Sequence, residues 1–296
     1  MQGIYVVDKP VGPSSHKVVS VMRRCTGTRR VGHCGTLDLL ASGVLILCVG
    51  RYTRLNEWLS RGSKEYLSTF RLGAESETDD AQGPILERAV DDPPQRNDVE
   101  RLVTTEFCGD LIQVPPVYSA VHVNGERSYR RARRGEQIVA KPRKVSVNEF
   151  EVTGFDYPEL QVRVVCSRGT YIRSLARDLG QRLGCGSYVQ DLRRTRVGNV
   201  GLADSTDLTA LQEAGLSVAP IAARRALDGI LPAIDVGGAV VADFLHGVAV
   251  EVDEAQEEGE RAVFAPDDVF LGVATAEAGR LQPKRVIADM SHFVES

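Results

Sequence analysis

The sequence lacks the usual signs of a metal, disulfide or membrane protein. Its six cysteines are scattered and none forms a C-x-x-C pair, which argues against a zinc site or a disulfide framework and favours reduced thiols. No apolar run reaches membrane length, and the N-terminus is too short and, at Asp8, too acidic for a signal peptide. Neither a G-x-x-x-x-G-K-[ST] motif nor a histidine cluster is present. We therefore expect a cytoplasmic protein that needs no metal, nucleotide or other cofactor.

Charge of either sign is not in large excess, since the formal net charge is −4, and this sum argues against a nucleic-acid partner. The distribution of the charges along the chain, by contrast, is compatible with a nucleic-acid partner. Lys17–Arg30 carries five cations and no acid, and Arg127–Lys144 carries eight cations against Glu136 alone. The acids gather instead at Glu75–Asp80 and Glu251–Glu260. A chain with separate basic and acidic patches can hold a polyanion on one face, although each run could equally be a solvated helix face.

The pattern of apolar residues predicts an α+β fold. The 296 residues are 43% hydrophobic and 26% charged, which is ordinary for a globular chain and enough for more than one domain. Strand and helix signals do not alternate regularly, so we expect a mixed β-sheet with flanking helices rather than a doubly wound fold. The expected strands lie at residues 4–7, 44–49 and 64–72 and among 145–166, and the expected helices at 14–24, 53–59, 98–107 and 169–183. Ser14 or Ser15 is the expected cap of the first helix and Asp98 that of the third. An acidic loop that contains a turn is expected at 74–83.

A domain boundary is predicted near Leu231–Gly238, where Pro232 and a Gly-Gly pair interrupt the chain. Residues 1–231 would form the main domain. Residues 238–296 would form a small β-rich domain, with strands expected at 248–252, 269–274 and 285–288.

The stretch Val31–Leu45 carries a single carboxylate, Asp38, between a glycine-rich approach and a small-residue exit. The apolar run that follows is typical of a buried strand, so Asp38 is expected in a loop leading into a sheet. Loops on a rigid scaffold often hold catalytic groups. A turn in which the aspartate caps backbone amides is the alternative.

The motif around Asp38 resembles the catalytic signature of the TruB-type pseudouridine synthases. Residues 32–45, G-H-C-G-T-L-D-L-L-A-S-G-V-L, match G-H-x-G-T-L-D-P-x-A-S-G-V-L except at Leu39, where the family usually has proline. Leu39 removes a φ restraint but leaves the carboxylate in place. Further family-like segments follow the family order over most of the chain: Val7–His16, Lys64–Tyr66, Leu72–Gly83, Pro115–Gly125, Arg168–Gly180 and Leu192–Arg196.

The resemblance implies a catalytic site formed by Asp38, Tyr66 and Arg173. Asp38 would be the catalytic carboxylate, and Arg173 would keep it ionised, since a buried carboxylate otherwise drifts toward neutrality. Tyr66 would stack on the flipped uracil and help in proton transfer. From the residues alone, Arg173 could be a surface arginine on an amphipathic helix, and Tyr66 a core residue on a strand.

The resemblance also implies RNA contacts outside the catalytic group. His33 would fill the space that a flipped base leaves, Lys64 would pair with a phosphate or with the pocket, and Leu192 would wall the pocket. Residues 118–144 correspond to a loop that closes over RNA, and the C-terminal domain to a PUA-like module. The arginines expected to contact phosphates, which we call the clamp arginines, are Arg130, Arg131, Arg133 and Arg134.

The leading interpretation is a monomeric tRNA pseudouridine synthase that isomerises the T-loop uridine at position 55, with the T-arm of tRNA as partner. A tRNA-binding folding chaperone with secondary catalysis is the alternative. A carboxylate-based glycosidase is disfavoured, because glycosidases generally need paired carboxylates and Asp38 has no acidic neighbour in its motif.

Overall fold

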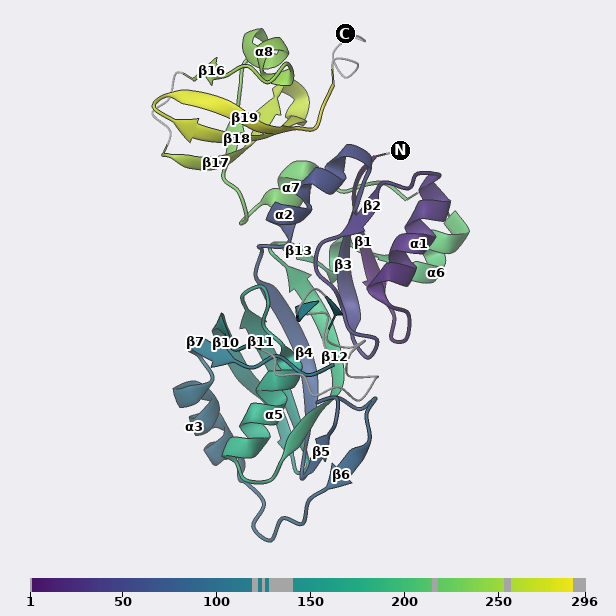
Figure 1. The fold of residues 1–296 in the computed structure, drawn as a ribbon, viewed down its shortest axis with the longest axis vertical. Helices are drawn as coiled ribbons and strands as arrows, with labels where there is room; N and C mark the ends of the chain where they lie inside the picture. Colours follow the sequence, from purple (N-terminus) through teal and green to yellow (C-terminus); the bar gives the residue numbers. More distant parts are fainter. Residues whose placement is uncertain are drawn as a thin grey trace. The chain divides into compact units, whose positions relative to one another are not determined.

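The computed structural model describes residues 2–118, 122–123, 126–127, 141–214, 218–252 and 257–289. The chain forms two compact units. Unit 1 comprises Met1–Leu37, Val44–Gly62 and Val197–Ser296, and unit 2 comprises Asp38–Gly43 and Ser63–Arg196. Figure 1 labels most helices and strands of both units. The predicted domains, residues 1–231 and 238–296, are continuous stretches of the chain, whereas each of these units combines separate stretches. The predicted division stays a prediction. In the described part of the chain, no helix is long and apolar enough to cross a membrane.

Unit 2 is built on neighbouring strands of a larger sheet, in the order β12-β4-β11-β10-β7. β4 pairs antiparallel with β11, β11 with β10, and β10 with β7, whereas Ser42 and Gly43 of β3 pair parallel with β12. The expected mixed sheet of an α+β fold is therefore confirmed. The strands are β3 (Ser42–Val49), β4 (Lys64–Leu72), β7 (Gly109–Gln113), β10 (Arg143–Asp156), β11 (Glu159–Cys166) and β12 (Ser187–Val197).

β4 shows why the sequence pattern is informative in this unit. Its burial alternates along its length, so one face carries Tyr66, Ser68 and Phe70 inward while intervening side chains are more exposed. The predicted strand at 64–72 matches its observed bounds.

Helix α5 (Ile172–Arg182) carries the Arg173 of the predicted site. Its buried face includes Ile172, Leu175 and Leu179, as the 3.6-residue period predicts. The helix starts three residues later than predicted, with Tyr171 as its N-cap. It ends as predicted, since Gly184 follows the C-cap residue with φ +74°, a left-handed conformation that glycine adopts easily.

Two local predictions in unit 2 are wrong. The acidic segment 74–83 contains the expected turns, at 77–78 and 81–82, but its first residues are not a loop, since they form β5 (Ala74–Ser76), which pairs with β6 (Ile85–Glu87). Helix α3 (Arg96–Glu106) starts before Asp98, which lies in its first turn and bonds to Arg101 instead of capping the helix. A short pair, β8 (His122–Val123) with β9 (Glu126–Arg127), completes the described elements of this unit.

The first part of unit 1 contains the strands that lead to and from the Asp38 loop. Ser14 caps α1 by accepting a bond from the amide of Lys17, as predicted. The segment expected as one helix at 53–59 is a 3-10 turn followed by four α-helical residues. The elements are β1 (Gly3–Lys9), α1 (Ser15–Thr26), β2 (Val31–His33), η1 (Gly50–Leu55), α2 (Asn56–Leu59), β13 (Val200–Gly201), η2 (Leu202–Asp204), β14 (Thr206–Asp207), α6 (Leu208–Ala214) and α7 (Ala223–Leu227).

The C-terminal part of unit 1 is a five-stranded sheet in the order β15-β17-β18-β19-β16. The strands predicted at 248–252 and 269–274 correspond to β16 and β18, whereas the one predicted at 285–288 overlaps only the end of β19. The strand β17 is not predicted, because its first residues belong to the acidic run that ends at Glu260. The elements are β15 (Ala233–Asp235), η4 (Gly238–Val240), α8 (Val241–Leu245), β16 (Val250–Glu251), β17 (Gly259–Ala265), η5 (Pro266–Asp268), β18 (Val269–Glu277) and β19 (Arg280–Val286).

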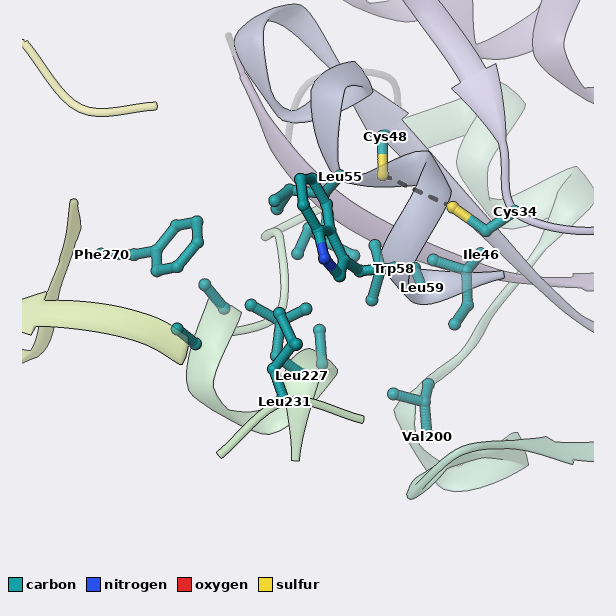
Figure 2. Packing of buried hydrophobic residues seen from close by; sticks show 14 of the residues in the cluster. Cys34, Ile46, Cys48, Leu55, Trp58, Leu59, Val200, Leu227, Leu231 and Phe270 are labelled. Carbon is teal, nitrogen blue, oxygen red and sulfur yellow. Dashed lines mark hydrogen bonds between the residues drawn. The ribbon is translucent and has the colours of Figure 1, made fainter. Parts of the chain in front are cut away.

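Trp58 lies in the main core of unit 1. Figure 2 shows it packed among Leu227, Leu231 and other apolar side chains of this unit, with Phe270 of β18 in the same cluster. Its indole nitrogen donates to Glu260 at 2.9 Å, and Arg61 and Lys284 also bind this carboxylate. Part of the acidic run is therefore neutralised by its own unit.

Candidate active site

Asp38 lies in the loop between β2 and β3. Its carbonyl accepts from the amide of Ala41 at 3.2 Å, and its side chain is 36% exposed. Just before it, the buried hydroxyl of Ser15 accepts from the amide of Leu37 at 2.8 Å and donates to the carbonyl of Leu37 at 3.1 Å. One side chain thus holds both main-chain groups of the residue that precedes the carboxylate, so the entry to the loop is fixed.

Gly43 sets the exit of the loop. Its φ is +104°, and a Cβ at this position would lie 2.1 Å from the carbonyl oxygen of Arg194 on β12. Only glycine fits where the two backbones approach so closely. The glycine near the aspartate is therefore required by the parallel pairing of β3 with β12.

Arg173 lies against Asp38, as the resemblance implied. Its Nε is 3.0 Å from Oδ2 of Asp38, and its side chain is only 4% exposed. The Nε–H is not aligned with that oxygen as a hydrogen bond, so the contact is one of charge. The positive charge of the buried guanidinium therefore lies directly beside the partly exposed carboxylate of Asp38.

The guanidinium of Arg173 is held on two further sides. Nη1 donates to the carbonyl of Thr78 at 2.9 Å and lies 3.4 Å from Oδ2 of Asp80, while Nη2 donates to the carbonyl of Tyr118 at 3.1 Å. Asp80 is itself fixed, because its Oδ1 accepts from the hydroxyl of Thr78 and the amide of Gln82. Arg173 is consequently shared by a buried carboxylate and the exposed one, with its plane set by two carbonyls.

Asp80 is a site residue that the sequence pattern does not single out. It stands in the middle of the acidic family-like segment Leu72–Gly83, for which the sequence predicts only a loop. Its 5% side-chain exposure and its contact with Arg173 distinguish it from a solvated acid. The sequence signal that could have identified Asp80 is its place in the pair Asp79-Asp80 within the family-like segment Leu72–Gly83.

Tyr66 projects from β4 and is 9% exposed. Burial raises its pKa, although a hydrogen bond and the charge of Arg194 oppose that rise, and the charge of Asp38 adds to it. Tyr66 therefore keeps its hydroxyl proton at neutral pH and lies close enough to Asp38 to respond to its charge. Arg194, 1% exposed and not predicted as a site residue, lies in the same group of side chains.

The remaining predicted site residues lie in several places. Lys64 on β4 and Leu192 on β12 are buried at 6% and 7% exposure, on neighbouring strands. His33 ends β2 in unit 1 and is half-buried. The roles predicted for these three residues stay predictions. The clamp arginines lie outside the described residues.

A metal site is not evident where the structure can be described, since no group of three or more His, Cys, Asp and Glu side chains gathers there. Hollows of about 870 Å³ and 430 Å³ both lie within unit 1, and Asp38 lines neither. The candidate site is identified instead by its charges: one partly exposed carboxylate, a buried arginine and a protonated tyrosine.

Comparison with known proteins agrees with the resemblance. The chain matches the TruB family pseudouridylate synthase N-terminal domain at residues 23–172, the tRNA pseudouridylate synthase B C-terminal domain at 173–236, and the pseudouridine synthase II TruB C-terminal domain at 232–287. It is 44% identical to the tRNA pseudouridine synthase B of Thermobifida fusca, over 97% of this chain and 98% of that protein.

Two further relatives extend this result. The tRNA pseudouridine synthase B of Streptomyces griseus is 41% identical, with 97% of each chain covered. Among solved structures, the crystal structure of a Cbf5–Nop10–Gar1 complex contains a chain that aligns with a TM-score of 0.74 and 25% identity, over 98% of this chain and 86% of that one.

Proposed function

The chain belongs to the TruB family of pseudouridylate synthases, and on that premise we propose that it isomerises the T-loop uridine at position 55 of tRNA, with Asp38 as the catalytic carboxylate. The observation that carries this proposal is the ion pair between Asp38 and the buried Arg173 inside the signature motif. The T-arm is the proposed binding element, and the proposed enzyme is a cytoplasmic monomer.

The chemical requirements of this isomerisation match the groups in the candidate site. The bond from C1′ to N1 breaks, the base turns, a bond from C1′ to C5 forms, and the proton on C5 is transferred to N1, so product and substrate contain the same atoms. One ionised carboxylate is needed, either to attack C1′ or C6 or to stabilise the charge that develops when the glycosidic bond breaks. Asp38 is partly exposed, so a substrate can reach it, and the buried positive charge of Arg173 lies beside it.

The neighbouring groups have distinct proposed roles. Arg173 orients the carboxylate of Asp38, and Asp80 holds Arg173 from its other side. Tyr66, protonated at neutral pH, stacks on the extruded uracil and hydrogen-bonds during proton transfer. A uridine in folded RNA must leave its stack to reach this site, and His33 would occupy the space it leaves.

Binding without chemistry is not favoured as the main activity. A folding chaperone needs a basic surface but no buried arginine directed at a carboxylate in a glycine-flanked loop. The charges of Arg173 and Asp80 are both buried, and a buried ion pair is often no more stable than apolar packing in its place, so their presence favours a defined polar site over a plain binding surface.

The test is formation of pseudouridine at position 55 in a tRNA transcript, mapped at nucleotide resolution. Wild-type protein should modify this uridine, and Asp38→Asn should form no product while binding the same tRNA within about threefold of the wild-type affinity, because the substitution removes a charge without changing shape. Product at another uridine only would contradict the proposed position, and product from Asp38→Asn would contradict the proposed catalytic residue.

A further inference from the structure

Gln113, the last residue of β7, uses both ends of its side-chain amide on one other residue. Its Nε2 donates to the carbonyl of Tyr171 at 3.0 Å, and its Oε1 accepts from the amide of Tyr171 at 2.7 Å. Gln113 is 2% exposed and lies 58 positions earlier in the chain. The side chain therefore pairs with the main chain of Tyr171 as a neighbouring strand would.

Tyr171 is the residue at which the helix carrying Arg173 begins. It has extended dihedral angles, φ −102° and ψ 112°, and its own side chain makes no capping bond. Where a helix start has no side-chain cap of its own, its position depends on the contacts that other elements make with its N-cap residue. Here that contact comes from Gln113, and Arg173 follows only two residues later.

The segment that follows Gln113 also contacts helix α5. The carbonyl of Val114 accepts from the hydroxyl of Ser174 at 2.8 Å and from Nη2 of Arg177 at 3.0 Å. Pro115 and Pro116 come next, and their rings restrict the backbone of the connection. Its described end is Tyr118, whose carbonyl accepts from Nη2 of Arg173.

Gln113 is thus connected to the guanidinium of Arg173 by two routes. One runs through Tyr171 and the first turn of α5, and the other through the proline-restricted connection to the carbonyl of Tyr118. Removal of the Gln113 amide would leave the amide of Tyr171 without its acceptor at the buried position of Gln113, and the carbonyl of Tyr171 would keep the amide of Leu175 as a donor. A shift of the helix start would then move Arg173 away from Asp38.

We propose that Gln113 is a positioning residue for the isomerisation, which acts by fixing the start of α5 and so the place of Arg173. The proposal rests on the roles proposed above for Asp38 and Arg173. It assigns to Gln113 no contact with substrate. A misplacement of about 1 Å in a catalytic group can cost about 100-fold in rate.

The experiment measures kcat and KM on full-length tRNA for Gln113→Ala in the complete chain. We expect kcat to fall about 10- to 100-fold, with KM within about threefold of wild type, because the RNA-binding surface is unchanged. Val103→Ala, a truncation of a buried side chain on α3 in the same unit, is the matched control for reduced stability and should keep kcat within about threefold.

Gln113→Glu gives a second measurement. The carboxylate can accept from the amide of Tyr171 but cannot donate to its carbonyl, whereas the protonated acid can do both. A buried carboxyl beside a carbonyl has a raised pKa, so the new side chain should become protonated as the pH is lowered from about 8 to about 6. The ratio of the wild-type kcat to that of Gln113→Glu should therefore decrease over this range. A constant ratio over this range would contradict the two-bond pairing as the source of the effect.

A double variant separates positioning from general damage. In an Arg173→Lys background, Gln113→Ala should lower kcat by less than about threefold, because the group it positions is already gone. A full additional decrease, or a single-variant kcat equal to that of Val103→Ala, would overturn the proposal. Full activity of Arg173→Lys itself would instead refute the role proposed for Arg173, so the two failures are distinguishable.

Discussion

Replacing Arg173 with lysine should lower kcat sharply while leaving a positive charge at the position. Arginine reaches Asp38 through Nε and two carbonyls through its other nitrogens, all at once. Lysine has a single ammonium group on a flexible chain and cannot reproduce this fork. The nearby carboxylate of Asp80 would compete for the ammonium and draw it away from Asp38.

The magnitude follows from the charges. Two unit charges 4 Å apart attract by about 4 kcal/mol at an effective dielectric of 20. Asp38 is 36% exposed, so solvent screening reduces this attraction to about 2–3 kcal/mol. If that energy is used to stabilise the transition state, its removal lowers kcat by about 30- to 150-fold, since 1.36 kcal/mol corresponds to a factor of ten.

Single-turnover kinetics with saturating protein measures the effect on chemistry alone. Arg101→Lys, on α3 and 74% exposed at its side chain, is the matched control and should have the wild-type rate. If Arg173→Lys reacts within about threefold of wild type, the argument that Asp38 depends on a positioned guanidinium is wrong.

Three further predictions concern stability, the loop and RNA binding. Burial by itself would raise the pKa of Glu260, but bonds from Lys284, Arg61 and Trp58 outweigh it and hold the pKa at about 2; this stabilisation is present above the unfolded pKa and disappears as pH falls through the folded one. Urea unfolding should find Glu260→Gln less stable than wild type by about 1–2 kcal/mol at pH 7, and this difference should narrow as the pH falls from 4.5 to about 2; a difference independent of pH would reject the cause. Ser15→Ala should cost about 1–3 kcal/mol of unfolding free energy in the same assay, because Leu37 loses two buried bonds, and an unchanged stability would contradict their importance. Neutralising all four clamp arginines should weaken tRNA binding and flatten its salt dependence by about 0.7 for each phosphate of single-stranded RNA that is no longer neutralised, whereas parallel salt plots of equal height would reject the clamp.

The parts of the molecule predicted well are those that a local pattern or an ordered motif specifies. The strand at 64–72 follows from its period of two, and the core face of α5 from its period of 3.6. The proximity of Asp38 and Arg173 follows only from the motifs, since 135 positions separate them (173 − 38) and no periodicity brings them together.

The parts that escape prediction depend on tertiary contacts. Nothing local to Gln113 indicates that its amide pairs with Tyr171, because the partner lies 58 residues away. Asp80 is one acid among several until Arg173 is placed beside it. The strand β17 is hidden for a related reason, since Glu260 looks like part of a solvated acidic run until its partners in unit 1 are known.

The central claim is that Asp38 performs the isomerisation of uridine 55. Its most direct test is nucleotide-resolution mapping of pseudouridine in tRNA incubated with wild type or Asp38→Asn, alongside the affinity of both proteins for that tRNA. We predict pseudouridine at position 55 with wild type, none with Asp38→Asn, and closely similar affinities. Two results would contradict the claim. One is pseudouridine at position 55 formed by Asp38→Asn, and the other is no pseudouridine at position 55 with wild-type protein that binds the tRNA.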